Sequence, residues 1–107
     1  GKFVGVVATD LRRPCGVAIR GPRCAVAELE GRVTILDRKF QVVGHLGDQP
    51  DTSIWATNLV ARDRWVDGQF LSPHAVCWDR DGDLFVMDWN REGRVTRLAR
   101  KKVEAVK

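Results

Sequence analysis

Apolar residues in this chain gather in short runs separated by turn-forming residues. Most of these runs are rich in β-branched residues and are bounded by Gly, Pro or Asp, a pattern typical of β-strands. Several runs, such as 16–19 and 84–87, are apolar at successive positions, which is characteristic of strands covered on both faces. We therefore expect strands at 3–8, 14–19, 24–28, 31–36, 40–46, 73–78, 84–88 and 93–98.

The predicted strands fall into two units that repeat the same order, residues 10–47 and residues 71–107. In each unit a proline opens the first strand, an acidic residue ends the second, and the tetrapeptide Gly-Arg-Val-Thr opens the third. That tetrapeptide stands at 31–34 and again at 93–96. An ordered series of matches of this kind indicates one supersecondary unit that occurs twice in the chain.

These residues resemble the NHL-repeat family of β-propellers. The NHL repeat typically reads Pro-x-Gly-Val-Ala-Val-Asp, then an apolar strand ending in Asp, then Arg-Val; residues 14–33 and 73–95 follow this order. The stretch 65–98 is similar to the closing blade of bacterial NHL-like propellers. The resemblance implies an all-β fold of four-stranded antiparallel blades, two in this chain. It does not imply one function, because propellers host many unrelated activities.

The two units differ in their number of strands. The second unit lacks a good outer strand, since its candidate at 103–106 is short and charged, whereas residues 1–9 hold an apolar strand that the first unit does not need. Propellers usually have four to eight blades and are commonly closed by pairing of their terminal strands. We expect three copies to form a homotrimeric ring of six blades, in which residues 1–9 complete a blade of a neighbouring copy. The residues expected at this oligomer interface are Phe3, Val4, Val6 and Val7.

Residues 48–70 join the two units and show no strand pattern. A connection of this length inside a compact fold is usually a packed or functional excursion over the surface. It carries Trp55 and Trp65, for which two interpretations remain open. The two tryptophans pack on the propeller surface, or they face a ligand.

The resemblance also implies a position for Cys15 and His74. Each follows the proline of its repeat, where the innermost strand of a propeller blade faces the central channel. Thiolate and imidazole are ligands for zinc and similar metals. In a propeller lyase that this repeat resembles, channel-facing histidines hold a metal, and only His74 matches them here. A divalent metal at His74 is one interpretation; a histidine that hydrogen-bonds a neighbouring strand is the other, and no cofactor is otherwise required.

The remaining charged and sulfur-containing residues indicate structural roles. We expect ion pairs between Glu28 and Arg32 and between Asp88 and Arg94, at equivalent turns of the two units. The acidic stretch 79–83 is expected to be a hairpin turn, because it lacks the glycine at position six and the glutamate at position twelve of a calcium loop. The three cysteines are expected to be buried free thiols, since they lie in apolar runs with no CxxC pair.

Charge and motifs narrow the classes of function. The net charge is +4 and the charges alternate in sign, so we do not expect a nucleic-acid partner. The apolar runs are far shorter than a membrane helix requires, and no phosphate-binding loop or nucleophile elbow is present in the sequence. The sequence indicates no cellular compartment. We expect a non-catalytic self-assembling scaffold or binding module of unknown ligand; the alternative is a metal-dependent lyase or hydrolase with His74 at the channel mouth.

Overall fold

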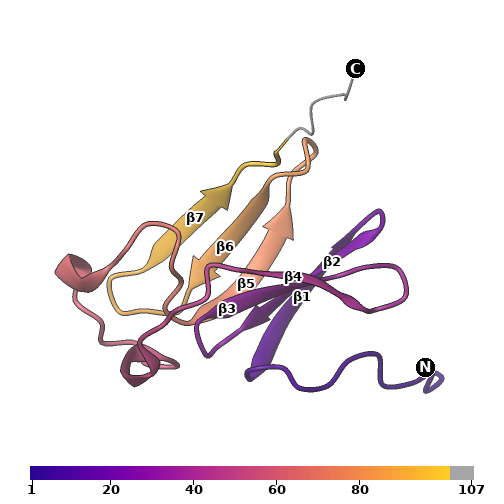
Figure 1. Ribbon diagram of the computed structural model, residues 1–107, viewed down its shortest axis with the longest axis horizontal. Coiled ribbons are helices and arrows are strands. Elements are labelled where there is room, and N and C mark those ends of the chain that lie inside the picture. Colours follow the sequence, from indigo (N-terminus) through magenta and orange to yellow (C-terminus); the bar gives the residue numbers. More distant parts are fainter. Residues whose placement is uncertain (102–107) are drawn as a thin grey trace.

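The computed structural model describes residues 1–101 and shows two antiparallel β-sheets (Figure 1). The first sheet has four strands in chain order, β1 (Pro14–Arg20), β2 (Arg23–Glu28), β3 (Arg32–Leu36) and β4 (Val42–Leu46). The second sheet has three, β5 (Pro73–Trp78), β6 (Leu84–Asp88) and β7 (Arg94–Leu98). The described residues contain no α-helix, so the all-β prediction is confirmed. The seven strands lie where the sequence predicted them, within two residues at each end.

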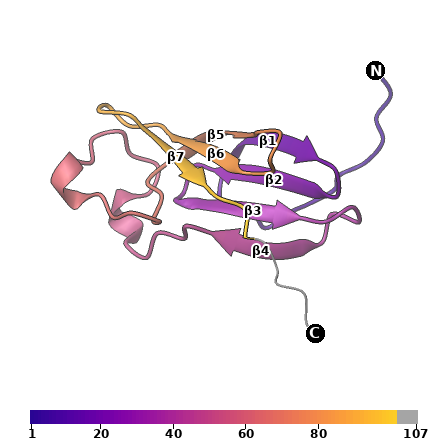
Figure 2. The same ribbon diagram turned by 90° about the horizontal axis from the view of Figure 1, so that it is seen from above.

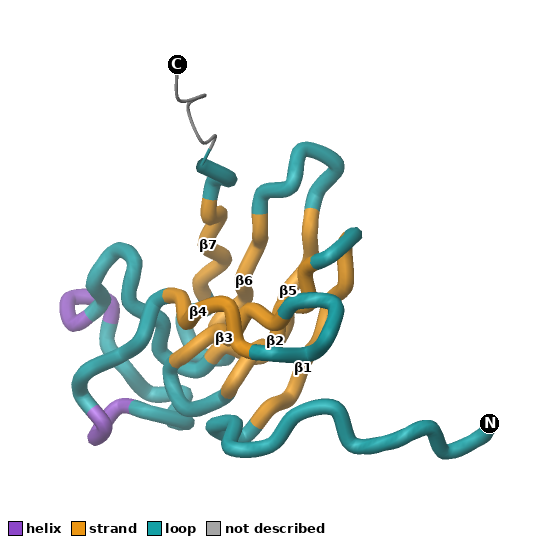
Figure 3. Tube along the Cα trace, turned by 45° about the vertical axis from the view of Figure 1, so that its right-hand side comes forward, coloured by secondary structure: helices purple, strands orange, loops and turns teal. Residues whose placement is uncertain are grey.

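The eighth expected strand is absent from the single chain. Residues 1–9 pair with neither sheet, and this N-terminal stretch runs away from both of them (Figures 1 and 3). The expected pairing with a neighbouring copy therefore stays a prediction. The weak candidate strand at 103–106 lies outside the described residues.

The two sheets pack against each other with β1 beside β5 (Figure 2). Gly16 is central to this contact, because a Cβ built on it would lie 2.8 Å from the carbonyl oxygen of His74. The lack of a side chain at Gly16 thus allows the two first strands to approach closely.

Residues 79–83 form the turn between β5 and β6, as expected. The Asp79 carboxylate accepts hydrogen bonds from the backbone N–H groups of Asp81 and Asp83, both at 2.9 Å.

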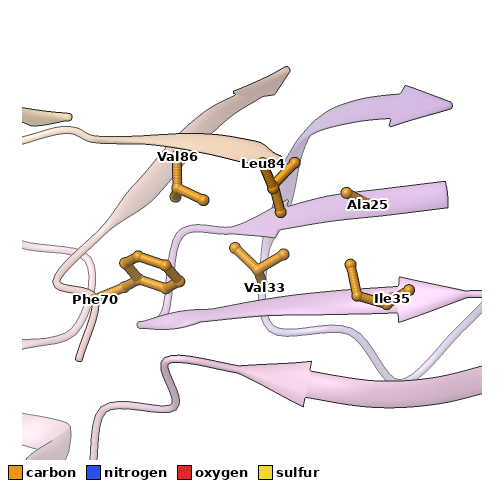
Figure 4. Close-up of a cluster of buried hydrophobic side chains, with 6 residues drawn as sticks. All are labelled: Ala25, Val33, Ile35, Phe70, Leu84 and Val86. Atoms are coloured by element: carbon orange, nitrogen blue, oxygen red, sulfur yellow. The ribbon is translucent and has the colours of Figure 1, made fainter. Parts of the chain in front are cut away.

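The main hydrophobic core fills the space between the sheets (Figure 4). Its buried members are Ala25, Val33, Ile35, Phe70, Leu84 and Val86. Trp78 packs against this core and donates its indole N–H to the carbonyl oxygen of Ala18 in the first sheet, at 3.0 Å. Phe85 points to the opposite face of the second sheet, because side chains alternate along a strand and both Leu84 and Val86 face the first sheet.

Residues 48–70 form the connection between the sheets and contain two single turns of 3₁₀-helix, η1 (Thr52–Ile54) and η2 (Arg62–Arg64). Both turns lie at the same end of the molecule, as Figure 3 shows. A second small core anchors the connection, made of the buried side chains of Ile54, Val60 and Leu71. None of the helices in the described part of the chain is long and apolar enough to cross a membrane.

Gly47 provides a test of this packing. Its φ is +61°, and a Cβ added there would overlap the ring of Phe70. We expect Gly47→Ala to lower the free energy of unfolding by about 1–3 kcal/mol, through overpacking and the left-handed backbone. Gly44→Ala is the matched control, since nothing lies within 4 Å of its added methyl group. Chemical denaturation that finds equal stabilities for the two variants would contradict the position of Phe70.

Candidate functional site

The turn between β2 and β3 is braced by Glu28, which is fully buried. Its carboxylate accepts two hydrogen bonds from the Arg32 guanidinium, both at 2.7 Å, which confirms the predicted ion pair. It also accepts hydrogen bonds from the backbone N–H of Arg12 at 2.9 Å and from the Thr34 hydroxyl at 2.7 Å. Burial acts to raise the pKa of Glu28, but the hydrogen bonds from Arg32, Arg12 and Thr34 outweigh it, so that the pKa is lowered.

Asp88 has the same role in the second unit. Arg94 binds one carboxylate oxygen through Nε at 3.0 Å and Nη2 at 2.8 Å, as predicted. The other oxygen accepts the backbone N–H groups of Leu71 and Ser72, both at 2.9 Å. Both oxygens of each carboxylate accept hydrogen bonds within the chain, so these residues tie the start of each repeat to the turn after its second strand.

Cys15 and His74 lie next to each other, at the starts of β1 and β5. Both residues are exposed, and the Cys15 thiol lies 3.1 Å from the carbonyl oxygen of Pro73 and 3.5 Å from that of His74. The Sγ atom itself is partly buried where it contacts the Pro73 carbonyl, and this partial burial raises the pKa of the Cys15 thiol and favours the uncharged form. Residues 1–101 contain no group of three or more His, Cys, Asp or Glu close enough to hold a metal ion. A metal shared between symmetry-related copies of His74 stays a prediction.

All three cysteines are free thiols, as expected, but only Cys24 is buried. The expected burial of Cys15 and Cys77 is wrong for the single chain. Cys77 is opposite Phe85 on the face of the second sheet that is turned away from the first. The apolar neighbours of Cys77 in the sequence favoured burial, but none of the strands within residues 1–101 covers this face.

The two tryptophans of the connection are half-buried and bound to the chain itself. The indole N–H of Trp55 donates to the carbonyl oxygen of Gln49 at 2.9 Å, and that of Trp65 donates to the carbonyl oxygen of Val60 at 3.1 Å. The Arg12 guanidinium lies 4.3 Å from the centroid of the Trp55 ring. These contacts favour the packing interpretation; a ligand at either tryptophan stays a prediction.

The expected interface residues Phe3, Val4, Val6 and Val7 are all exposed, Val4 by 95%. Ala8, directly after them, packs against a small cluster of Cys24, Val26 and Leu36 on the free face of the first sheet. The N-terminal segment therefore extends away from the first sheet, starting at this free face. Within the described residues, its large apolar side chains stay exposed.

The free faces of the two sheets are apolar as well. The free face of the first sheet, which is turned away from the second sheet, carries Val17, Ile19, Cys24, Val26 and Leu36. Ala8 and Leu11 pack on the last three, which are buried, whereas Val17 and Ile19 are exposed. The free face of the second sheet carries Cys77, Phe85, Met87, Val95 and Arg97. Ile19 is 68% exposed and Val95 is 66% exposed. Exposed apolar residues that gather on one surface usually mark an interaction site.

The repeat shows how these two faces are related. At the positions equivalent to the free face of the first sheet, the second unit has Val76, Trp78, Leu84, Val86 and Leu98. All five of these residues line the contact between the sheets within the chain. Conversely, Ala25 and Val33 line that contact in the first unit, and their equivalents Phe85 and Val95 lie on the free face of the second sheet. The two sheets are therefore packed head-to-tail. The free face of the first sheet is equivalent in the repeat to the packed face of the second sheet, and the free face of the second sheet is equivalent to the packed face of the first.

One position departs from this equivalence. Arg97 stands on the free face of the second sheet where the first unit has the buried Ile35. Its guanidinium binds the Asp83 carboxylate at 2.6 Å and lies 5.9 Å from the centroid of the Phe85 ring. Its charge is thus paired within its own sheet.

Comparisons with models of protein families and with curated proteins find no match to this chain. The geometry of the free faces consequently carries the functional argument. Two exposed apolar faces are what an isolated pair of blades implies, but the residues of each face could not be assigned from the sequence, because runs that are apolar at every position do not distinguish one face of a strand from the other.

Proposed function

We propose that this protein is a non-catalytic self-assembling scaffold, in which three copies form a six-bladed, NHL-type β-propeller ring. The observation that carries the proposal is the head-to-tail packing of equivalent faces. In the proposed ring, the second sheet of one copy packs with its free face on the free face of the first sheet of the next copy. This contact repeats the one between the two sheets within a chain. Such heterologous contacts form a ring when the rotation between copies closes.

The N-terminal segment supports the same arrangement. β7 is the last strand of its sheet among the described residues, whereas the first sheet has the further strand β4. Ala8 lies on the face of the first sheet where the next copy would pack. Residues 1–7 then continue toward the β7 edge of that copy and provide the fourth strand of its second blade. Edge strands are otherwise prone to non-specific pairing. In the ring His74 would occur three times around the axis, where it stays the candidate for a divalent metal.

The mass in solution tests this proposal. We expect light scattering to give three times the chain mass of 12.0 kDa, and a chain without residues 1–7 to lose this trimer. That deletion retains Ala8, which packs within its own chain. A stable monomer of the complete chain would contradict the proposal.

Two substitutions separate assembly from folding. Ile19→Asp places a charge on the free face of the first sheet and is expected to give a folded monomer, because Ile19 is exposed in the single chain. Leu59→Asp is the control: Leu59 is 70% exposed but lies in the connection, away from both free faces. Circular dichroism should be unchanged in both variants, and only Ile19→Asp should alter the mass. An unchanged mass for both variants would show that this face is not an interface.

A further inference from the structure

A cavity of about 620 Å³ lies between the two sheets, at the end that carries the β1–β2 and β5–β6 hairpins. Its floor consists of apolar side chains from both sheets, namely Ile35, Leu46, Trp78, Leu84 and Leu98. The indole N–H of Trp78 is already bound to Ala18, so the ring offers the cavity an apolar surface. A volume of this size is typical of sites for small organic ligands.

The rim of the cavity is strongly basic. It is formed by Arg20, Arg23, Arg100 and Lys101, and the lining residues within 1–101 include no carboxylate. Within residues 1–101, none of these four side chains takes part in an ion pair. In the β5–β6 turn, the Asp83 carboxylate is bound by Arg97 and by the backbone N–H of Arg100.

The side chains of the rim differ in how firmly they are held. Arg20 is fixed across the cavity mouth, because its Nη2 donates to the carbonyl oxygen of Arg80 at 2.6 Å. This bond connects the hairpins of the two sheets and leaves the other N–H groups of Arg20 for a ligand. Arg23 and Arg100 have no such bond within the described residues. Arginine suits this role because its planar fork of donors matches a carboxylate.

We propose that this cavity binds an organic anion with an apolar body, of the chemical class of a medium-chain carboxylate. The chain of the ligand lies on the apolar floor and its carboxylate is bound by the arginines of the rim. The described lining of the cavity comes from one chain, and Leu98 within it belongs to β7, at whose edge the proposed ring places residues 1–7 of a neighbouring copy.

Isothermal titration with monomeric decanoate tests the site, with decanol and acetate as the two matched partial ligands. We expect decanoate to bind. Decanol lacks the carboxylate, and with it two exposed ion pairs, so it should bind about fivefold more weakly. Acetate lacks the apolar chain and should not bind. In the double variant Arg23→Gln/Arg100→Gln the affinity for decanoate should fall about fivefold, to that of decanol. The bond between the Arg100 backbone and Asp83 is retained in that variant. Equal affinities for decanoate and decanol, or an unchanged affinity in the double variant, would overturn the proposal.

Three further variants locate the site. Ala99→Trp adds bulk to the lining without removing a core side chain, and it should abolish binding of decanoate. Arg91 lies in the turn between β6 and β7, at the end of the second sheet opposite the cavity. Arg91→Gln should therefore bind decanoate as the parent chain does. A chain that ends at Lys101 should also bind normally. Loss of binding in either of these last two variants, or normal binding in Ala99→Trp, would place the ligand elsewhere.

Discussion

Glu28→Ala is expected to lower the free energy of unfolding by about 3–5 kcal/mol, because it leaves the buried guanidinium of Arg32 without its counter-charge. The substitution also removes the acceptor for the Arg12 backbone and the Thr34 hydroxyl. Chemical denaturation at a fixed protein concentration measures this loss, since assembly would otherwise add to the stability. Asp67→Ala is the control, because Asp67 is exposed and should change the stability by no more than about 0.5 kcal/mol.

The parent chain and Glu28→Ala should also differ in how their stability responds to acid. Because the pKa of Glu28 is lower in the folded than in the unfolded chain, the ionised carboxylate stabilises the fold. This contribution is fully present above the unfolded pKa, about 4.3. It is lost as the pH falls from that value through the lower folded pKa. The difference in stability between the parent chain and Glu28→Ala should therefore narrow in acid; a difference that is constant with pH would contradict the ionised state of Glu28.

The second large effect is expected at Phe70. This side chain is fully buried between the sheets and is the largest in the core, so Phe70→Ala should cost about 3–5 kcal/mol. Phe85→Ala is the informative comparison. In the single chain Phe85 is half-buried on the free face, and we expect a smaller loss at protein concentrations where the chains are separate.

Association should change the comparison between the two phenylalanines. If the free faces pack together, a second copy covers Phe85, and the loss caused by Phe85→Ala should grow with protein concentration. The loss caused by Phe70→Ala should not grow in this way, since Phe70 is already buried within the chain. A concentration series of thermal unfolding measures both. A constant loss at Phe85 would show that no copy covers this face.

The strand positions could be predicted from the sequence because turn residues bound each run. Arg80-Asp81-Gly82 and Arg20-Gly21-Pro22 mark the two hairpins without any tertiary information. The ion pairs of Glu28 and Asp88 were predictable for a different reason. In both units the acidic residue ends the second strand and the arginine belongs to the Gly-Arg-Val-Thr tetrapeptide, although the two residues are four positions apart in the first unit and six in the second.

The orientation of side chains could not be predicted in the same way. In the run 84–87 every residue is apolar, so periodicity does not show that Leu84 and Val86 face the first sheet while Phe85 and Met87 do not. The cavity was missed because its floor and rim come from both ends of the chain. Only the packing of β1 beside β5 places the hairpin of Arg23 near Arg100.

The close approach at Gly16 has a consequence for the stoichiometry of the proposed ring. In the proposed ring β1 and β5 would be the innermost strands, so the gap between them would be the narrow side of a wedge whose angle fixes how many blades complete a full turn. A side chain at Gly16 would push against the His74 carbonyl and widen the narrow side. Neighbouring blades would then be rotated less with respect to each other. One missing methyl group would in this way set the number of subunits in a closed ring, and a larger residue at this position would favour bigger rings or open chains.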